Sequence, residues 1–411
     1  MTRTRTGVDL GAYPITAVLC ALTCALTPAY TLRWRIGFYP STVLEDAIVL
    51  TVAAFVFESW RARMMPRLLT PLTVPALIFL LAGAIDVVVS PDRRAALGIY
   101  RAYLIEPVAF FFVLSEVVRT WRVATLVMAG LAAAGMIVGI ANSVVILDAI
   151  RLHTISPGVT GPVTIYTNAN DIALFLVPLI ALAGSITLYA HDRRERIVAG
   201  VVLAIAVVST LLSFSRGGYL ALAAVALGLA LSHRRRWWLV SAAAAAAVVL
   251  LLLPPINQRV GVELDFHNSQ NTLVGRLELW RVSLQMLQQH VLFGGGLSGF
   301  AQSIAPYWNA THIDRFIYPH NIVLTFWSET GLLGLGAFAW VVATTFVMSA
   351  RGWRTANDWR PVELGVLVAM VAVVVHGLVD VPYFKNDLSL EFWVLVGLAW
   401  AGRRWSEPKK A

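Results

Sequence analysis

The stretch "IVLTFWSETGLLGLGAFAWVVATTFVMSA" (residues 322–350) is apolar for longer than a helix needs to cross a membrane. About 20 predominantly apolar residues span a hydrocarbon core that is roughly 30 Å thick. The segment "IYPHN" (317–321) precedes this run, so His320 and Asn321 stand where the predicted helix begins. The sequence therefore predicts a membrane helix with a histidine at its entrance, which either caps the helix or moves a proton.

Comparable apolar runs recur along the whole chain of 411 residues, which is 58% hydrophobic and only 13% charged. Soluble domains usually carry about 25% charged residues. The runs do not alternate as the strands of a β-barrel do. We predict an all-α polytopic membrane protein with about twelve transmembrane helices, at residues 13–32, 39–59, 70–89, 99–118, 123–148, 169–190, 197–214, 217–232, 238–254, 321–349, 362–381 and 387–402.

Basic residues distinguish the two sides of the predicted bundle. Alternate loops, among them "RARMMPR", "HDRRER" and "RGWRTANDWR", carry 20 of the 32 Lys and Arg residues. The positive-inside rule places these loops and both termini in the cytoplasm. The net charge of +9 follows from this arrangement, so we expect the lipid bilayer as a partner and no nucleic acid.

Residues 255–320 form the one long loop, on the predicted outer side of a single integral membrane domain that covers residues 1–411. Loops of this length are usually functional or disordered. Within the loop, residues 272–290 space Leu277, Trp280, Leu284 and Leu287 as one apolar stripe, which predicts an amphipathic helix on the outer membrane surface. The segment "FGGGLSGF" (293–300) then predicts a Gly-rich turn.

Several charged residues stand where lipid makes charge costly, which by default marks a functional site. Arg216, in "SFSRGGYLAL", is either a plain loop arginine or an anion ligand, and the two glycines after it would leave the backbone open to an anion. Arg276 shares a face of the predicted outer helix with Trp280, and Arg281 lies on a neighbouring face. Both arginines are either interfacial anchors or site residues.

Two candidates belong to the tenth predicted helix itself. His320 and Asn321 each suit the role of helix cap. If Asn321 is the cap, His320 is available for a functional site. Glu329 lies deeper, on the face of Thr325, and is expected to be protonated or hydrogen-bonded to another helix.

Other candidates lie at the ends of neighbouring predicted helices. His376 and Asp380, in "HGLVD", are one turn apart and form either an interhelical clasp or a catalytic dyad. Asn170, in "TNANDIA", is expected first at a helix N-terminus and second as a substrate contact.

The sequence contains no Walker A, GxSxG or HExxH motif. Glu263 and Asp265 form the one acidic pair of this spacing in an external loop, which favours a metal site only weakly. We expect no metal and no other cofactor.

The segments "TNANDIA", "SFSRGGYLAL", "GRLELWRVSLQM", "PHNIVLTFWSETGLLG" and "HGLVDVPYFKNDLSL" follow one another in this order. Together they resemble the O-antigen ligase / O-antigen polymerase superfamily, the Wzy-C type of membrane glycosyltransferase, over about residues 160–400. The resemblance implies a GT-C-like fold with its active site on the outer, periplasmic face of the bacterial cytoplasmic membrane. It also implies that Arg216 and Arg276 hold a diphosphate and that His320 serves catalysis.

The resemblance implies that a glycan passes from an undecaprenyl-diphosphate carrier to a sugar hydroxyl of lipid A-core without a metal. Direct displacement at the anomeric carbon predicts inversion of its configuration. The residue types fit, because arginine grips phosphate oxygens bidentately and histidine suits a general base at neutral pH. Alternatives with the same donor are a polysaccharide polymerase and a protein O-glycosylating ligase. A lipid or solute transporter and a structural protein are further alternatives; the absence of a convincing internal repeat and the long external loop favour an enzyme.

Overall fold

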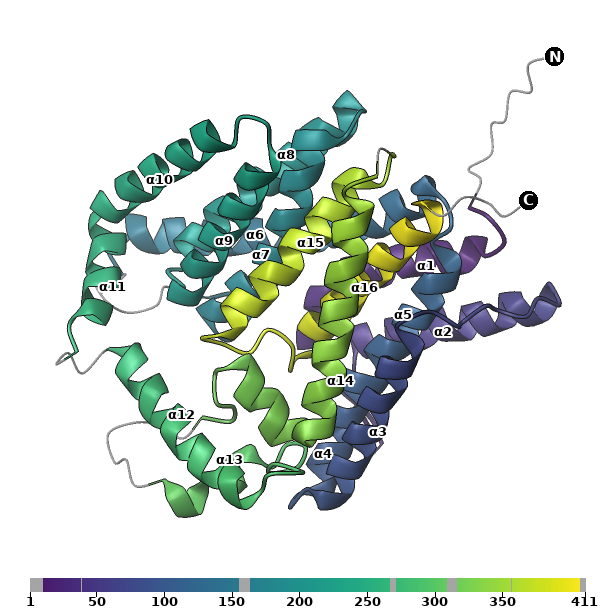
Figure 1. The fold of residues 1–411 in the computed structure, drawn as a ribbon, viewed down its shortest axis with the longest axis horizontal. Helices are drawn as coiled ribbons and strands as arrows, with labels where there is room; N and C mark the ends of the chain where they lie inside the picture. The colour runs from purple at the N-terminus through teal and green to yellow at the C-terminus, as the bar shows by residue number, and fades with distance from the viewer. Residues whose placement is uncertain are drawn as a thin grey trace.

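The computed structural model describes residues 10–37, 39–154, 163–266, 271–308, 316–355 and 357–406. The chain forms a bundle of helices with one small hairpin, in which β1 and β2 pair in antiparallel (Figure 1). In chain order the elements are α1 (Pro14–Ala25), the 3-10 helix η1 (Thr27–Thr31), β1 (Arg33–Ile36), β2 (Tyr39–Thr42), α2 (Val43–Arg61), α3 (Thr73–Val89), α4 (Arg93–Ile99), the π-helix η2 (Tyr100–Ile105), α5 (Glu106–Val117), α6 (Trp121–Arg151), α7 (Ala169–Tyr189), α8 (Arg193–Leu212), α9 (Arg216–Ser232), α10 (Arg236–Leu252), α11 (Pro254–Leu264), α12 (Thr272–Gln289), α13 (Phe300–Ser303), the 3-10 helix η3 (Ala305–Tyr307), α14 (Ile322–Gly352), α15 (Arg360–Gly377) and α16 (Asn386–Ser406).

The predicted all-α class is confirmed, since a helix lies at each of the twelve predicted spans. Within the described residues, six helices are long and apolar enough to cross a membrane, and the pair α10–α11, bent by 90°, is a possible seventh. Helices α1, α3 and α9 are apolar but shorter. Twelve crossings and the GT-C-like detail therefore stay predictions. The six are Arg93–Val117, Trp121–Arg151, Ala169–Tyr189, Arg193–Leu212, Ile322–Gly352 and Arg360–Gly377.

The centre of the bundle is formed by α7 and α15. In the most apolar 18-residue stretch of each helix, 78% and 72% of the stretch is buried. A helix that is apolar all round is stable only when it is surrounded by other elements or by lipid. The Ser185 hydroxyl of α7 donates to the Pro361 carbonyl of α15 over 2.6 Å, which ties the two helices together at one end. By contrast, α8 is only 28% buried and presents its side chains to the surroundings.

Helix α14 is interrupted at Gly331, whose backbone has φ 59° and ψ −174°. The sequence predicts an unbroken span over 321–349, so this break is a difference from the prediction. The long loop before α14 approaches the helix at this point, where the Leu332 N–H donates to the Leu292 carbonyl over 3.0 Å. A Cβ on Gly331 would lie 2.3 Å from that carbonyl oxygen. The part of α14 that follows His320 is therefore a short helix, which ends before the longer part begins.

The long outer segment is folded, and α12 and α13 lie at one edge of the bundle beside α14 (Figure 1). The predicted helix is confirmed as α12. Of its predicted apolar stripe, Leu287 is buried, whereas Leu277 and Leu284 are 49% and 45% exposed, so contact of these two side chains with the membrane surface stays a prediction. Helix α12 is apolar on more than one side. Its buried side packs against residues 300–308, at the end of the long loop, and against the start of α14. This cluster consists of Leu279, Val282, Met286, Leu287, Phe300, Ile304, Trp308 and Leu324.

Candidate functional site

A histidine and an aspartate from two different connections meet at the outer segment. His320 lies two residues before the first residue of α14, and Asp380 lies three residues after the last residue of α15. His320 Nδ1 lies 2.9 Å from Asp380 Oδ1. The histidine side chain is 21% exposed and the aspartate 5%, so the imidazole is the accessible member of the pair. His320 also has φ 50°, a left-handed conformation that is uncommon outside glycine and that recurs at functional sites.

Asp380 is held as an anion. Burial alone would raise its pKa, but the hydrogen bond and charge of His320 and the guanidinium of Arg276 outweigh burial and place the pKa at about 2. A carboxylate can only accept a hydrogen bond, so the proton between the two residues belongs to His320 Nδ1. In the neutral imidazole, Nε2 then carries the lone pair that accepts a proton.

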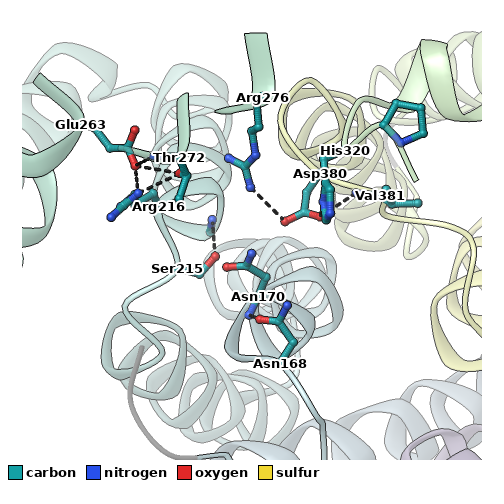
Figure 2. A network of polar contacts seen from close by, with 12 residues as sticks. Asn168, Asn170, Ser215, Arg216, Glu263, Thr272, Arg276, His320, Asp380 and Val381 are labelled. Carbon is teal, nitrogen blue, oxygen red and sulfur yellow. Dashed lines mark hydrogen bonds and ion pairs between the residues drawn. The ribbon is translucent and has the colours of Figure 1, made fainter. Parts of the chain in front are cut away.

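Two residues of α12 reach this pair from one face of the helix. The Arg276 guanidinium lies 3.7 Å from Asp380 Oδ2, and Figure 2 shows it pointing toward that carboxylate. The Trp280 indole N–H donates to the Pro319 carbonyl over 2.9 Å, next to His320. Burial lowers the pKa of Arg276, while Asp380 opposes that shift. The predicted shared face of Arg276 and Trp280 is thus directed at the histidine.

Arg216, the second predicted anion ligand, is the first residue of α9. It forms an ion pair with Glu263, and its guanidinium donates to the Thr272 hydroxyl over 2.8 Å. The Glu263 carboxylate also accepts the N–H groups of Thr272 and Leu273 at the start of α12. Arg216 is therefore joined to the helix that carries Arg276, and Figure 2 shows both arginines in one region with Asn170.

The segment that carries Arg216, Arg276 and His320 matches a known protein family. Residues 199–339 match the family model Wzy_C, described as O-antigen ligase. The match runs from α8 into α14 and includes Arg216, Arg276 and His320. No curated protein matches the chain.

The Wzy_C match confirms the resemblance to the O-antigen ligase / O-antigen polymerase superfamily. The family indicates a membrane glycosyltransferase of ligase or polymerase type that acts on lipid-linked glycans, and with the apolar helices it indicates a protein of the bacterial inner membrane. Asp380 lies beyond the matched residues, so its place at the site comes from the geometry alone.

The two glycines after Arg216 have another use than the one predicted. A Cβ on Gly218 would lie 2.5 Å from the Ala173 side chain, and a Cβ on Gly217 would lie 3.0 Å from His376. Both positions are buried. The glycines let α9 approach α7 and α15, and whether their backbone also faces an anion stays a prediction.

Asn321 acts as a helix cap. Its side-chain oxygen accepts the N–H groups of Val323 and Leu324, and its amide donates to the Leu378 carbonyl over 3.1 Å. The residue fixes the His320 segment to the connection that carries Asp380. Asn321 is thus a cap, and it leaves His320 for the site.

Helix α7 begins in the same region. Asn168 caps it by accepting the Asn170 N–H over 3.0 Å, which confirms the predicted helix N-terminus. Asp171, one residue further, forms an ion pair with Lys385, whose side chain is 29% exposed. Whether Asn170 contacts substrate stays a prediction.

Three predicted site residues lie apart from the His320–Asp380 pair or serve packing. Arg281 is 55% exposed and forms its ion pair with Glu278 over 2.5 Å, on the other side of α12. Glu329 is buried and accepts the Ser298 N–H of the Gly-rich turn over 2.6 Å. His376 is buried beside Gly217 and lies near enough to Asp380 for an electrostatic interaction, but Asp380 accepts its hydrogen bonds from His320 and the Val381 N–H. Among the described contacts, the predicted His376–Asp380 hydrogen bond is not formed.

Glu263 belongs to the acidic pair Glu263–Asp265, which the sequence offered as a weak signal for a metal against the expectation of none. The Glu263 carboxylate faces Arg216 and the start of α12, and a bound cation would compete with that guanidinium. Across the described ranges, no group of three or more His, Cys, Asp or Glu side chains is arranged to hold a metal ion.

Three residues of this region were missed by sequence reasoning in the roles they take. Asp380 was paired with the wrong histidine, Glu263 was considered only for metal, and Lys385 was not considered. A lysine beside a membrane helix is itself a signal, because such residues are rare and usually paired. The partners of Asp380 and Glu263 come from distant segments, and one sequence carries no signal for such pairings.

Proposed function

We propose that this protein is a glycosyltransferase of the O-antigen ligase type, which moves a glycan from undecaprenyl diphosphate to a sugar hydroxyl of lipid A-core. The observation that carries the proposal is the His320–Asp380 pair with Arg276 beside it, near the start of α12 and the start of α14. Two of these three residues lie in the Wzy_C match, which supports donor chemistry of this kind.

Arg216 and Arg276 are proposed to hold the diphosphate of the donor. Their side chains are 14% and 16% exposed, so each guanidinium is largely shielded from water but accessible. Carboxylates orient both groups before substrate binds, and a diphosphate, with its larger charge, competes for the same N–H donors. The positive charge would then stabilise the negative charge that develops on the leaving diphosphate, without a metal ion.

His320 is proposed to activate the acceptor. Nε2 takes the proton of the acceptor hydroxyl while that oxygen forms a bond to the anomeric carbon of the donor. The bond from this carbon to the diphosphate oxygen breaks, and the electron pair leaves on undecaprenyl diphosphate. Asp380 stabilises the imidazolium that forms. Attack opposite the leaving group inverts the configuration at the anomeric carbon.

The proposed site opens to the outer, periplasmic side of the membrane, with both termini in the cytoplasm. The charge asymmetry of the loops supports this orientation. The site and the Arg-rich connections lie at opposite ends of α7: Asn170 is at its start, and the basic segment 193–196 follows its end.

The purified protein, reconstituted with an undecaprenyl-diphosphate glycan, tests the proposal when three acceptors are offered separately: lipid A-core, a second lipid-linked glycan and an acceptor protein. We expect glycan on lipid A-core and an inverted linkage. Product only on the lipid-linked glycan would make the protein a polymerase, and product only on protein a protein ligase. No product with any acceptor, in protein that retains its fold, would contradict the transferase assignment.

A further inference from the structure

A cavity of about 260 Å³ lies between α6, α7 and α8, well away from His320. Along α7, Ile186 of the cavity is about 24 Å from Asn170, at 1.5 Å per residue. The walls are almost entirely apolar. They are formed mainly by the side chains of Met128, Leu131, Leu182, Ile186 and Val202.

The charged residues of the cavity wall gather at one end. Arg194 and Glu195 lie in the first turn of α8, and Trp121 is the first residue of α6. The Trp121 indole N–H donates to the Glu195 carboxylate over 2.9 Å, which fixes that carboxylate at the end of the cavity. The space thus has a basic and an acidic group at one end and an apolar body.

The cavity opens on the apolar face of α8 that points away from the other helices. Val198, which lines it, is 61% exposed, and the neighbouring Ile197 is 56% exposed. An apolar face of this kind on a membrane-crossing helix is in contact with lipid. The molecule that enters the cavity from this side is therefore supplied by the bilayer.

We propose that this cavity binds a bilayer phospholipid of the phosphatidylethanolamine type. One acyl chain lies along the apolar walls between Arg194 and Val202, about 12 Å of helix at 1.5 Å per residue. The headgroup phosphate pairs with Arg194 and its primary ammonium with Glu195, so the two charges of the headgroup meet two opposite charges at the end of the cavity. Basic pockets between membrane helices bind the phosphates of anionic lipid headgroups, which is the part of this contact that Arg194 supplies.

Native mass spectrometry of the full-length protein tests the proposal after delipidation and titration with phosphatidylethanolamine, phosphatidylcholine or phosphatidylglycerol. We expect one molecule of phosphatidylethanolamine to bind in preference to the other two lipids. Arg194→Ala should weaken its binding at least tenfold. Glu195→Gln, which still accepts the Trp121 hydrogen bond, should bind phosphatidylethanolamine and phosphatidylcholine alike.

Two further variants separate the cavity from surface charge. Arg193→Ala removes an exposed neighbouring arginine that does not line the cavity, and should bind lipid as the unmodified protein does. Ala132→Phe fills the cavity and should abolish binding. The proposal is overturned if Arg194→Ala binds phosphatidylethanolamine as tightly as Arg193→Ala does, or if phosphatidylglycerol is preferred, since surface charge then accounts for binding.

Discussion

His320 and Asp380 are 60 residues apart in the chain, and their Nδ1 and Oδ1 atoms are 2.9 Å apart in the fold. The contact joins the entrance of α14 to the exit of α15. Because Asp380 is buried and anionic, it fixes which imidazole nitrogen carries the proton. The contact therefore places the imidazole proton of His320 on Nδ1 and leaves Nε2 as the nitrogen that can accept a proton.

Asp380→Asn should lower kcat by about 100-fold or more, because the amide can donate to Nδ1 and thereby place the imidazole proton on Nε2. Steady-state transfer by the reconstituted protein measures the effect. Asp148→Asn serves as the control, since Asp148 is exposed and forms an ion pair with the exposed Arg151 at a helix end. Unchanged kcat in Asp380→Asn would show that Asp380 does not select the imidazole tautomer.

The ionisation of Asp380 should stabilise the fold by an amount that depends on pH. Its folded pKa of about 2 lies below the usual aspartate value of about 3.9, so the stabilisation is present above about pH 4 and is lost as pH falls toward 2. We expect a contribution of about 2 kcal/mol. Thermal unfolding from pH 7 to pH 2 should show the difference between the unmodified protein and Asp380→Asn shrinking below about pH 4. A difference that stays constant to pH 2 would contradict the depressed pKa.

Arg276 and Arg281 provide a matched pair on α12. Arg276→Ala should raise the donor KM or lower kcat/KM roughly 10–100-fold, the range for losing a charge-assisted contact. Arg281→Ala should behave like the unmodified protein, because Arg281 is exposed and pairs with Glu278 alone among the contacts resolved here. Arg276→Lys retains charge beside Asp380 and separates an effect on folding from one on phosphate binding. Equal losses in Arg276→Ala and Arg281→Ala would argue against a specific diphosphate contact.

Gly331→Ala should unfold the junction between α14 and the outer segment, at a cost on the order of 3 kcal/mol or more. The position needs a positive φ, and a methyl group would meet the Leu292 carbonyl. Gly336→Ala, five residues further on the same helix, meets nothing within 4 Å and should be neutral or stabilising. Thermal unfolding in detergent compares the two, and equal midpoints would contradict the role of the break.

The class of fold and the positions of the helices follow from the sequence, because apolar runs and basic loops are local signals. The break at Gly331 does not, since the "GLLGLG" pattern equally suits close helix packing, and the cause of the break is a distant carbonyl. Which side of α12 packs against the protein does not follow from the sequence, for a related reason. That helix is apolar on two sides, and only its neighbours determine which side is buried.

At the candidate site, the sequence identified the residue types that suit phosphate binding and proton transfer. His320, Arg216 and Arg276 were each singled out before any contact between them was known. Their partners were not, because Asp380 and Glu263 pair across 60 and 47 residues of chain. The i, i+4 spacing favoured His376 as the partner of Asp380, but the histidine that forms the hydrogen bond to Asp380 is His320.

The central claim is that His320 takes the proton of the acceptor hydroxyl. The most direct measurement is the single-turnover rate of glycan transfer from undecaprenyl diphosphate by purified, reconstituted His320→Ala, with exposed His290→Ala as the matched control. We predict a rate lower by about 10²- to 10⁴-fold in His320→Ala, the range for loss of a general base, with donor binding retained and His290→Ala unaffected. Transfer by His320→Ala at the rate of the unmodified protein would contradict the claim.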